Sequence, residues 1–303
     1  MKRTDPATIA RAVAMRRTHS LKQIADELGV SVGTVKSWMA RSGIKLGDNQ
    51  ALRALMTLPP IKANEGTAVV VAPELPLQEA VTGIPDLDAM LWLRAVVATE
   101  HPDHIARALE AVKRIKTPAK EIEGAYAMWV RARHGDMAGV FASIGFADLK
   151  RHAEEVTRDA AIRAEALARF GTTEALLGES HADRAIAEAL SSLDWSHGEA
   201  NPAEVAELLK ARPDLLPMTL ADCLHELIYW DSLWRLRRPF GCQDHYAESV
   251  ARIEFVFCEL AHIRPRDKAE AIAVLHWLAA ADDGDAMQRD EVQEILENLI
   301  GCP

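Results

Sequence analysis

The segment Ser20–Arg41, SLKQIADELGVSVGTVKSWMAR, carries the strongest structural signal in this chain of 303 residues. Ser20 followed three residues later by Gln23 is a capping box, which predicts that a helix begins at this point. Gly29 can adopt the left-handed conformation that often follows a helix end. Ser31 can then cap a second helix. The segment therefore predicts two short helices joined by a tight turn.

Another helix is expected before this pair. Asp5 is a good N-cap, Pro6 suits the first helical position, and the apolar pattern continues to about Arg17. Apolar side chains recur at helical spacing in all three segments, and small residues stand where two helices must touch. The expected core consists of Ile9, Ala12, Val13, Leu21, Ile24, Ala25, Leu28, Val30, Val35, Trp38 and Met39.

Together these residues match the general helix-turn-helix pattern, which depends on Ala25 and Gly29 at the joint and on Ile24, Val35 and Trp38 in the core. Residues 1–46 resemble the DNA-binding heads of resolvases and transposases, the promoter-binding regions of sigma factors, and the heads of small terminase subunits. The resemblance implies that this part of the chain binds duplex DNA. It does not extend to the rest of the chain, which contains no recombinase-type catalytic domain of the α/β class.

In such heads the last helix enters the major groove, and its exposed N-terminal side faces the base edges. Lys36 is the only long hydrogen-bond donor on that side, and Val32 is suited to contact a thymine methyl group. Other basic or hydroxyl side chains are better placed for phosphates or an adjacent minor groove. The expected base-reading residues are Ser31, Val32, Gly33, Lys36, Ser37 and Ala40. The expected phosphate or minor-groove residues are Lys2, Arg3, Arg16, Arg17, Lys22, Thr34 and Arg41.

This base-reading face offers little chemistry for discrimination. One good bidentate contact contributes about 1–3 kcal/mol, whereas useful specificity requires about 4–10 kcal/mol over nonspecific binding. A single head is therefore expected to be insufficient. We predict a homo-oligomer that brings at least two heads onto neighbouring half-sites.

Charge is distributed unevenly along the chain. Residues 1–47 contain nine Lys or Arg and three acidic residues, a charge of +6. The whole chain carries −10, so the remainder carries −16. A basic head on an acidic body is expected if only the head approaches phosphates.

The rest of the chain predicts an all-α protein. Prolines and glycines interrupt residues 47–83, which are interpreted as a linker with a short helix near Leu52–Leu58 and an isolated strand at Ala68–Ala72. Helix-stop signals then recur throughout residues 84–303. The predicted organisation is a helix-turn-helix domain at 1–46, a linker at 47–83, and an all-α oligomerisation or interaction domain at 84–303. The later helices are expected at residues 86–99, 103–116, 120–134, 146–170, 182–193, 202–211, 220–237, 245–262, 267–281 and 289–300.

Several patterns resemble functional sites but are given structural interpretations. Cys242 and His245 with Cys258 and His262 resemble a zinc set, but one continuous helix would hold His245 and Cys258 about 20 Å apart. Scattered carboxylates lack a partnered His, and no phosphate-binding glycine loop or nucleophile motif is present. We expect no enzyme activity, no metal and no cofactor.

The pair Trp230 and Trp234, followed by Arg235, Arg237 and Arg238, is interpreted as a core helix with cations near its C-terminus, rather than a basic aromatic patch. No signal peptide is recognisable, and the longest near-apolar run is too short to span a bilayer. The cysteines are spaced singly, as in reducing compartments. We expect a cytoplasmic protein that does not bind membranes.

The sequence thus predicts a protein that binds double-stranded DNA sequence-specifically. The first interpretation of its role is an oligomeric transcriptional regulator. Two alternatives remain open. One is the DNA-recognition subunit of a phage or mobile-element machine, similar to a small terminase subunit. The other is a helical scaffold that binds a protein partner through the C-terminal domain and uses the head as a minor anchor. The target sequence and the sign of regulation are not encoded in these patterns.

Overall fold

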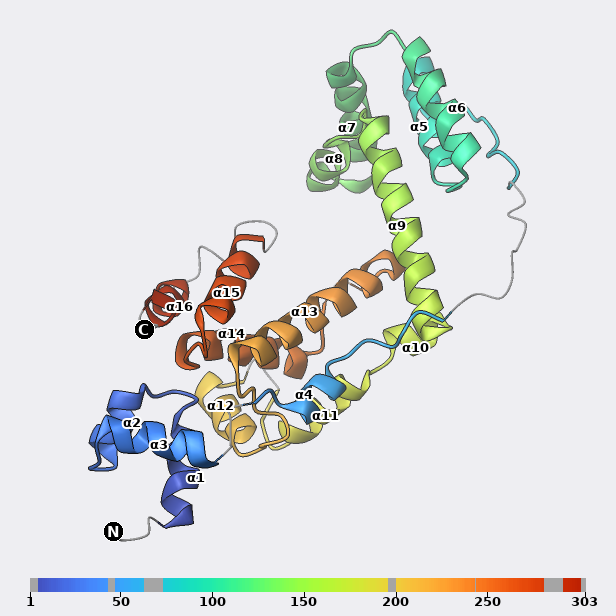
Figure 1. The fold of residues 1–303 in the computed structure, drawn as a ribbon. Helices are drawn as coiled ribbons and strands as arrows, with labels where there is room; N and C mark the ends of the chain where they lie inside the picture. Colours follow the sequence, from blue (N-terminus) through green and yellow to red (C-terminus); the bar gives the residue numbers. More distant parts are fainter. Residues whose placement is uncertain are drawn as a thin grey trace. The chain divides into compact units, whose positions relative to one another are not determined.

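A computed structural model of the chain describes residues 5–42, 47–62, 73–195, 200–242, 244–280 and 291–300. All regular elements in these residues are helical, with no strand among them, so the all-α prediction is confirmed (Figure 1). The chain divides into two compact units. Unit 1 comprises residues 1–60 and 172–303, and unit 2 comprises residues 61–171.

The N-terminal part of unit 1, here called the head, contains α1 (Pro6–Met15), α2 (Leu21–Glu27) and α3 (Val32–Ser42). The predicted capping box is present: Gln23 N donates to Ser20 Oγ at 3.2 Å, and Ser20 N donates to Gln23 Oε1 at 2.8 Å. Gly29 has φ +63°, which suits the turn between α2 and α3. The sequence signals for these helix boundaries are confirmed.

Three helices of the head pack around one small core. Ala12 of α1, Ile24 and Ala25 of α2, and Val35 and Trp38 of α3 are buried together. The partly buried side chains around them are Ile9, Met15, Leu21, Leu28, Val30 and Met39. Met15 is the addition to the predicted set, and Val13 is buried as expected although it lies outside this cluster.

The remainder of unit 1 is built around α13 (Leu220–Arg237) and α14 (Ala247–His262), which pack against each other. Further contacts join α14 to α11, α12 and α16, and join α13 to α4, α10 and α15. These surrounding helices are α4 (Gln50–Leu55), α10 (Thr173–Leu177), α11 (His181–Ala189), α12 (Pro202–Lys210), α15 (Lys268–Ala280) and α16 (Glu291–Ile300), and a 3-10 turn, η2 (Arg238–Phe240), follows α13.

Polar side chains join α13 to its neighbours inside unit 1. The fully buried Arg252 donates from Nε and Nη2 to the carboxylate of Glu226, with both contacts at 2.7 Å. Trp230 is 1% exposed and donates from Nε1 to Glu226 Oε1 at 3.2 Å. Arg237 forms a buried ion pair with Asp183 at 3.0 Å. Trp230 therefore belongs to the interior, as the core-helix interpretation expected, and Arg237 is buried as well, where that interpretation expected a cation near the helix C-terminus.

Unit 2 contains α5 (Pro85–Val97), α6 (Pro102–Ala111), η1 (Val112–Arg114), α7 (Ala119–His134), α8 (Asp136–Ser143) and α9 (Leu149–Phe170). Its core forms where α5 packs against α6, α7 and α9. The fully or nearly fully buried side chains there include Leu87, Met90, Leu93, Ile122 and Leu149. No helix among the described residues is long and apolar enough to cross a membrane.

Helices α8 and α10 were not expected from the sequence. The short helix expected near Leu52–Leu58 is present as α4, with Leu52 and Met56 buried in unit 1. The compact units divide the chain at about residues 60 and 171. The expected strand at Ala68–Ala72 lies outside the described residues.

Candidate nucleic-acid interface

The two sides of α3 differ sharply in exposure. Val35 is fully buried and Trp38 is 4% exposed, so one side of the helix is fixed in the core of the head. Val32 is 36% exposed, and Lys36 also lies on the solvent side. Of the six predicted base-reading residues, Ser31, Val32, Gly33, Lys36 and Ala40 are exposed, and Ser37 is half-buried.

Ser31 and Thr34 shape the start of α3. Thr34 N donates to Ser31 Oγ at 3.1 Å, and the two hydroxyl oxygens are 2.9 Å apart. Ser31 thus caps the helix as predicted, and its hydroxyl satisfies a backbone donor that would otherwise have no partner within the helix. Because both hydroxyls are held by these contacts, they provide fixed polar groups at the exposed end of α3.

The predicted phosphate-binding residues occupy different environments. Lys22 is exposed on α2, while Arg16 is half-buried and donates from Nη1 to His19 O at 3.2 Å. Lys2 and Arg3 lie outside the described residues, and Arg41 is described only as part of the α3 backbone.

Arg17 lies in the interior of unit 1, away from the exposed side of the head where a phosphate contact was expected. Its side chain is 11% exposed and forms an ion pair with Glu259 of α14. Arg17 Nε also donates to Pro217 O at 2.8 Å, and Arg264 N donates to Arg17 O at 2.8 Å. The guanidinium is therefore used to hold the head on the rest of unit 1, and the backbone of the same residue contributes.

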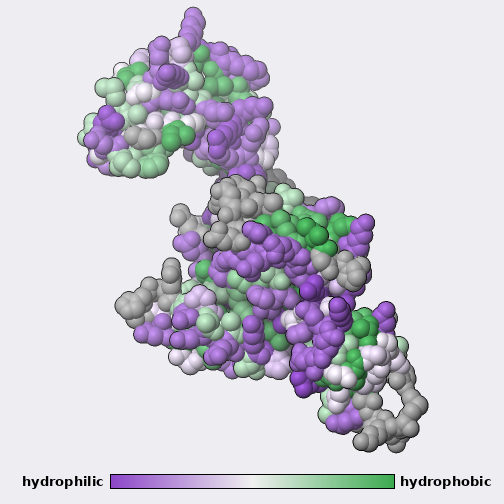
Figure 2. All heavy atoms as spheres, turned by 90° about the vertical axis from the view of Figure 1, so that its left-hand side faces the viewer, coloured by the Kyte–Doolittle hydropathy of each residue, from purple (hydrophilic) through white to green (hydrophobic). Residues whose placement is uncertain are grey.

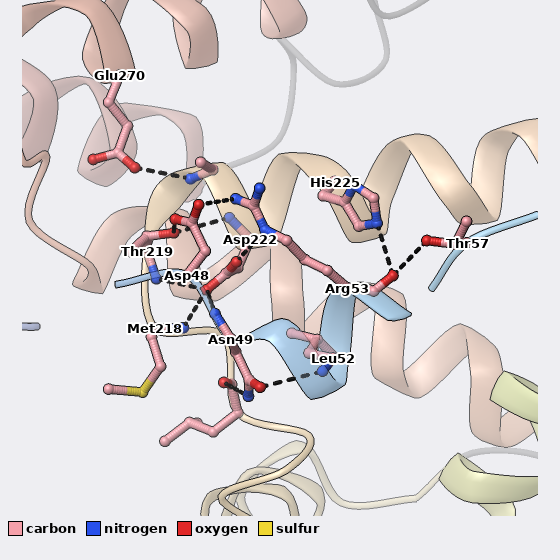
Figure 3. Close-up of polar contacts among 12 residues, drawn as sticks. Asp48, Asn49, Leu52, Arg53, Thr57, Met218, Thr219, Asp222, His225 and Glu270 are labelled. Atoms are coloured by element: carbon pink, nitrogen blue, oxygen red, sulfur yellow. Dashed lines mark hydrogen bonds and ion pairs between the residues drawn. The ribbon is translucent and has the colours of Figure 1, made fainter. Parts of the chain in front are cut away.

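A second set of contacts holds the chain just after the head (Figure 3). The buried carboxylate of Asp222, at the start of α13, accepts hydrogen bonds from Asn49 N at 2.9 Å and Arg53 Nε at 2.7 Å. It also accepts from Met218 N at 3.0 Å. Asp48 adds ion pairs with Arg53 at 3.1 Å and Arg266 at 2.9 Å.

Asn49 strengthens this second attachment. Its side-chain nitrogen donates to Pro213 O at 3.0 Å and Leu216 O at 2.9 Å, and its side-chain oxygen caps α4 by accepting from Leu52 N. We call the contacts of Arg17 the first anchor, and those of Asp48, Asn49 and Arg53 the second anchor. Because the anchors flank α2 and α3 in the sequence, they fix both ends of the α2–α3 segment to the rest of unit 1.

The cysteine and histidine residues that resembled a zinc set have other contacts. His262 Nδ1 lies 2.9 Å from Cys258 O, one helical turn earlier. The ring of His245 packs edge-on against Trp230, with 5.6 Å between ring centroids. Within the part of the chain that the structure describes, no three His, Cys, Asp or Glu side chains are grouped so as to hold a metal ion.

Comparison with models of protein families, with curated proteins and with solved structures finds no match for this chain. The geometry and charge of the head and its contacts with the rest of unit 1 are therefore the observations that bear on function.

Proposed function

We propose that this protein binds double-stranded DNA through α2 and α3 and acts as an oligomeric transcriptional regulator. The observation that carries the proposal is the two-sided character of α3. Its inner side is fixed by Val35 and Trp38, and its outer side presents Val32 and Lys36 to solvent. This is the arrangement that a helix needs to lie in a major groove while its own fold stays intact.

Charge supports the same assignment. Residues 1–47 carry +6 whereas the rest of the chain carries −16, so phosphates are attracted to the head and repelled by the remainder. Lys22 and Lys36 are the exposed basic residues that best fit this role among the described residues of α2 and α3. Arg17 takes no part in the proposal, since Glu259 neutralises its charge.

Two anchors also suit an oligomer that combines several heads, each of which discriminates weakly between DNA sequences. A tethered head would find its half-site independently, whereas an anchored head has an orientation set by the body to which it is attached. We therefore propose that assembly of the body fixes the spacing of the half-sites.

Unit 2 offers a surface for such assembly. Met128 of α7 and Met137 and Phe141 of α8 are 72%, 67% and 67% exposed, and Ile144 follows α8 at 72%. Large apolar side chains exposed on two helices that pack together suit a protein interface. Figure 2 shows apolar patches on the part of the surface that unit 2 contributes, between hydrophilic side chains. We propose that a second copy of the chain covers this surface.

The test is recovery and sequencing of DNA bound by the protein in cells, combined with the mass of the complex in solution. A regulator is expected to recover paired half-sites at a constant spacing and to form a dimer or tetramer. A ring of many subunits would favour a role in DNA packaging instead. Recovery of no common sequence, with binding that does not fall as salt rises, would refute DNA binding.

A further inference from the structure

A cavity of about 560 Å³ lies in unit 1 beside α12 and α14. Ligand pockets in proteins usually have volumes of about 300–1,000 Å³ and predominantly apolar walls. This cavity has both properties, because apolar side chains from the two helices and from the preceding loop form most of its described lining. They include Trp195, Pro202, Val205, Ala206, Val250 and Phe255.

Part of this apolar lining is accessible to water. Val250 of α14 is 44% exposed, and Trp195 and Ala206 are half-buried. Contact between apolar surface and water is unfavourable, so a ligand that covers these side chains is stabilised by the hydrophobic effect. The lining also contains the aromatic rings of Trp195 and Phe255, which suit contact with a planar ring system.

The charged groups of the lining already have partners. The carboxylate of Glu259 forms an ion pair with Arg17, and Lys210 Nζ lies 3.7 Å from its Oε1. Glu254 is exposed to water and has an interaction of its own. A charged ligand would therefore lose its hydration without meeting an unpaired counter-ion among the described lining residues, which is unfavourable. The cavity thus favours an uncharged ligand.

Volume, lining and charge together define the ligand class. We propose that the cavity binds a small uncharged organic molecule with an apolar body that contains a planar ring. The carboxylate of Glu259 stays paired with Arg17 in the occupied cavity, so the ligand lies beside the first anchor without replacing either partner. The site belongs to unit 1 alone, and neither its ligand nor its tests depend on the proposed DNA binding.

Three probes that share a naphthalene body and differ in charge test the ligand class. At neutral pH, 2-(1-naphthyl)ethanol is uncharged, 2-(1-naphthyl)ethylamine is a cation and 1-naphthaleneacetate is an anion. Titration calorimetry with the full-length protein measures their affinities. The alcohol is expected to bind about tenfold more tightly than either ion, because an ion would be desolvated without a partner. No measurable binding of the alcohol, equal affinities for all three, or tighter binding of either ion would overturn the proposal.

Two substitutions on α12 locate the binding site. Ala206 lines the cavity, so Ala206→Trp is expected to abolish binding of the alcohol by filling it. Ala203 is exposed on the same helix outside the lining, so Ala203→Trp is the matched control and should bind as the unmodified protein does. Unchanged binding by Ala206→Trp would show that the probe binds elsewhere. A matched loss in both variants would also count against the cavity.

A measurement on the unmodified protein does not depend on how these variants fold. The indole N–H resonance of Trp195, identified by its absence from the spectrum of Trp195→Phe, should shift when the alcohol binds, because the naphthalene ring changes the local magnetic field. Trp92 of unit 2 lies outside the lining and donates from Nε1 to Pro76 O at 2.8 Å, so its resonance should not move. Binding without a shift at Trp195, or with equal shifts at both indoles, would overturn the location of the site.

Discussion

A Cβ atom on Gly139 would lie 2.7 Å from the carbonyl oxygen of Ala127, so α8 and α7 can pack as closely as they do only with glycine at this position. A Cβ there would also lie 3.0 Å from the Cβ of Arg131, so a methyl group fits only if atoms of α7 or α8 shift. The close approach is what gives the short helix α8 its extensive contact with α7.

Gly139→Ala is therefore expected to destabilise unit 2 by about 1–3 kcal/mol, because backbone atoms would have to move apart. Gly124, inside α7, is the matched control, since a Cβ there meets no atom within 4 Å. Gly124→Ala should stabilise the helix by up to about 1 kcal/mol. Urea unfolding followed by circular dichroism measures both changes, and equal effects of the two variants would contradict the close packing.

Replacement of Arg17 tests the first anchor. Arg17→Ala leaves the carboxylate of Glu259 buried without its guanidinium partner, at an expected cost of about 3–5 kcal/mol. Arg11→Ala is the control: Arg11 pairs with Glu27 at 2.8 Å, but the side chains are 62% and 44% exposed. Its cost should be about 0–1 kcal/mol in the same urea titration. A small effect of Arg17→Ala would mean that the head is not held by this contact.

Acid pH should lower the free energy of unfolding of unit 1, because Asp183 becomes protonated. Burial acts to raise the pKa of this carboxyl, but hydrogen bonds from Ser180 and Ser249 and the charge of Arg237 outweigh it and lower the pKa. A carboxyl with a depressed pKa in the folded state stabilises the fold above its unfolded pKa, and this stabilisation disappears as pH falls from about 4 through the folded value.

Asp183→Asn should therefore reduce stability at pH 7 and flatten its decline in acid. The measurement is the free energy of unfolding at a series of pH values between neutrality and acid. An undiminished acid decline in Asp183→Asn would assign that decline to other carboxyls.

If the head binds DNA as proposed, substitutions of Lys36 and Lys22 should separate base reading from phosphate contact. Lys36→Ala is expected to weaken binding to the preferred site by about 1–3 kcal/mol and to leave binding to random DNA nearly unchanged. Lys22→Ala should weaken binding to the preferred site and binding to random DNA equally. It should also lower the slope of log affinity against log salt concentration by about one. Fluorescence anisotropy at several salt concentrations distinguishes them. Equal losses at Lys36 on both DNAs would restrict this residue to phosphate contact.

The sequence predicts most of this fold because its signals are local. Ser20 and Gln23 are three residues apart, and their mutual caps are found in the structure. The stretch 220–237 likewise forms a helix with the predicted boundaries. Helix α8 was missed because Gly135 and Asp136 suggested a break, and the element that follows is short and contains Gly139. Helix α10 has only five residues, too few for a periodic pattern.

The candidate site is predictable only where its geometry is local. The exposed side of α3 follows from the spacing of Val35 and Trp38, but the environment of Arg17 does not. Its partner Glu259 lies 242 residues further along the chain, and no spacing rule connects them. A basic residue at the end of a helix in a basic head is equally compatible with binding phosphate and with binding a distant carboxylate. Only tertiary structure decides between these two roles.

Unit 2 interrupts unit 1 in the chain, and this has a consequence for synthesis. The core of the head forms from residues 9–39 and can fold as soon as they leave the ribosome. Asn49, in contrast, binds Pro213, which lies 164 residues later. At about 5–20 residues per second, translation of that interval takes roughly 8–33 s. In every new chain the residues that build the core of the head are therefore present for this interval before the contacts that set the orientation of α2 and α3 can form.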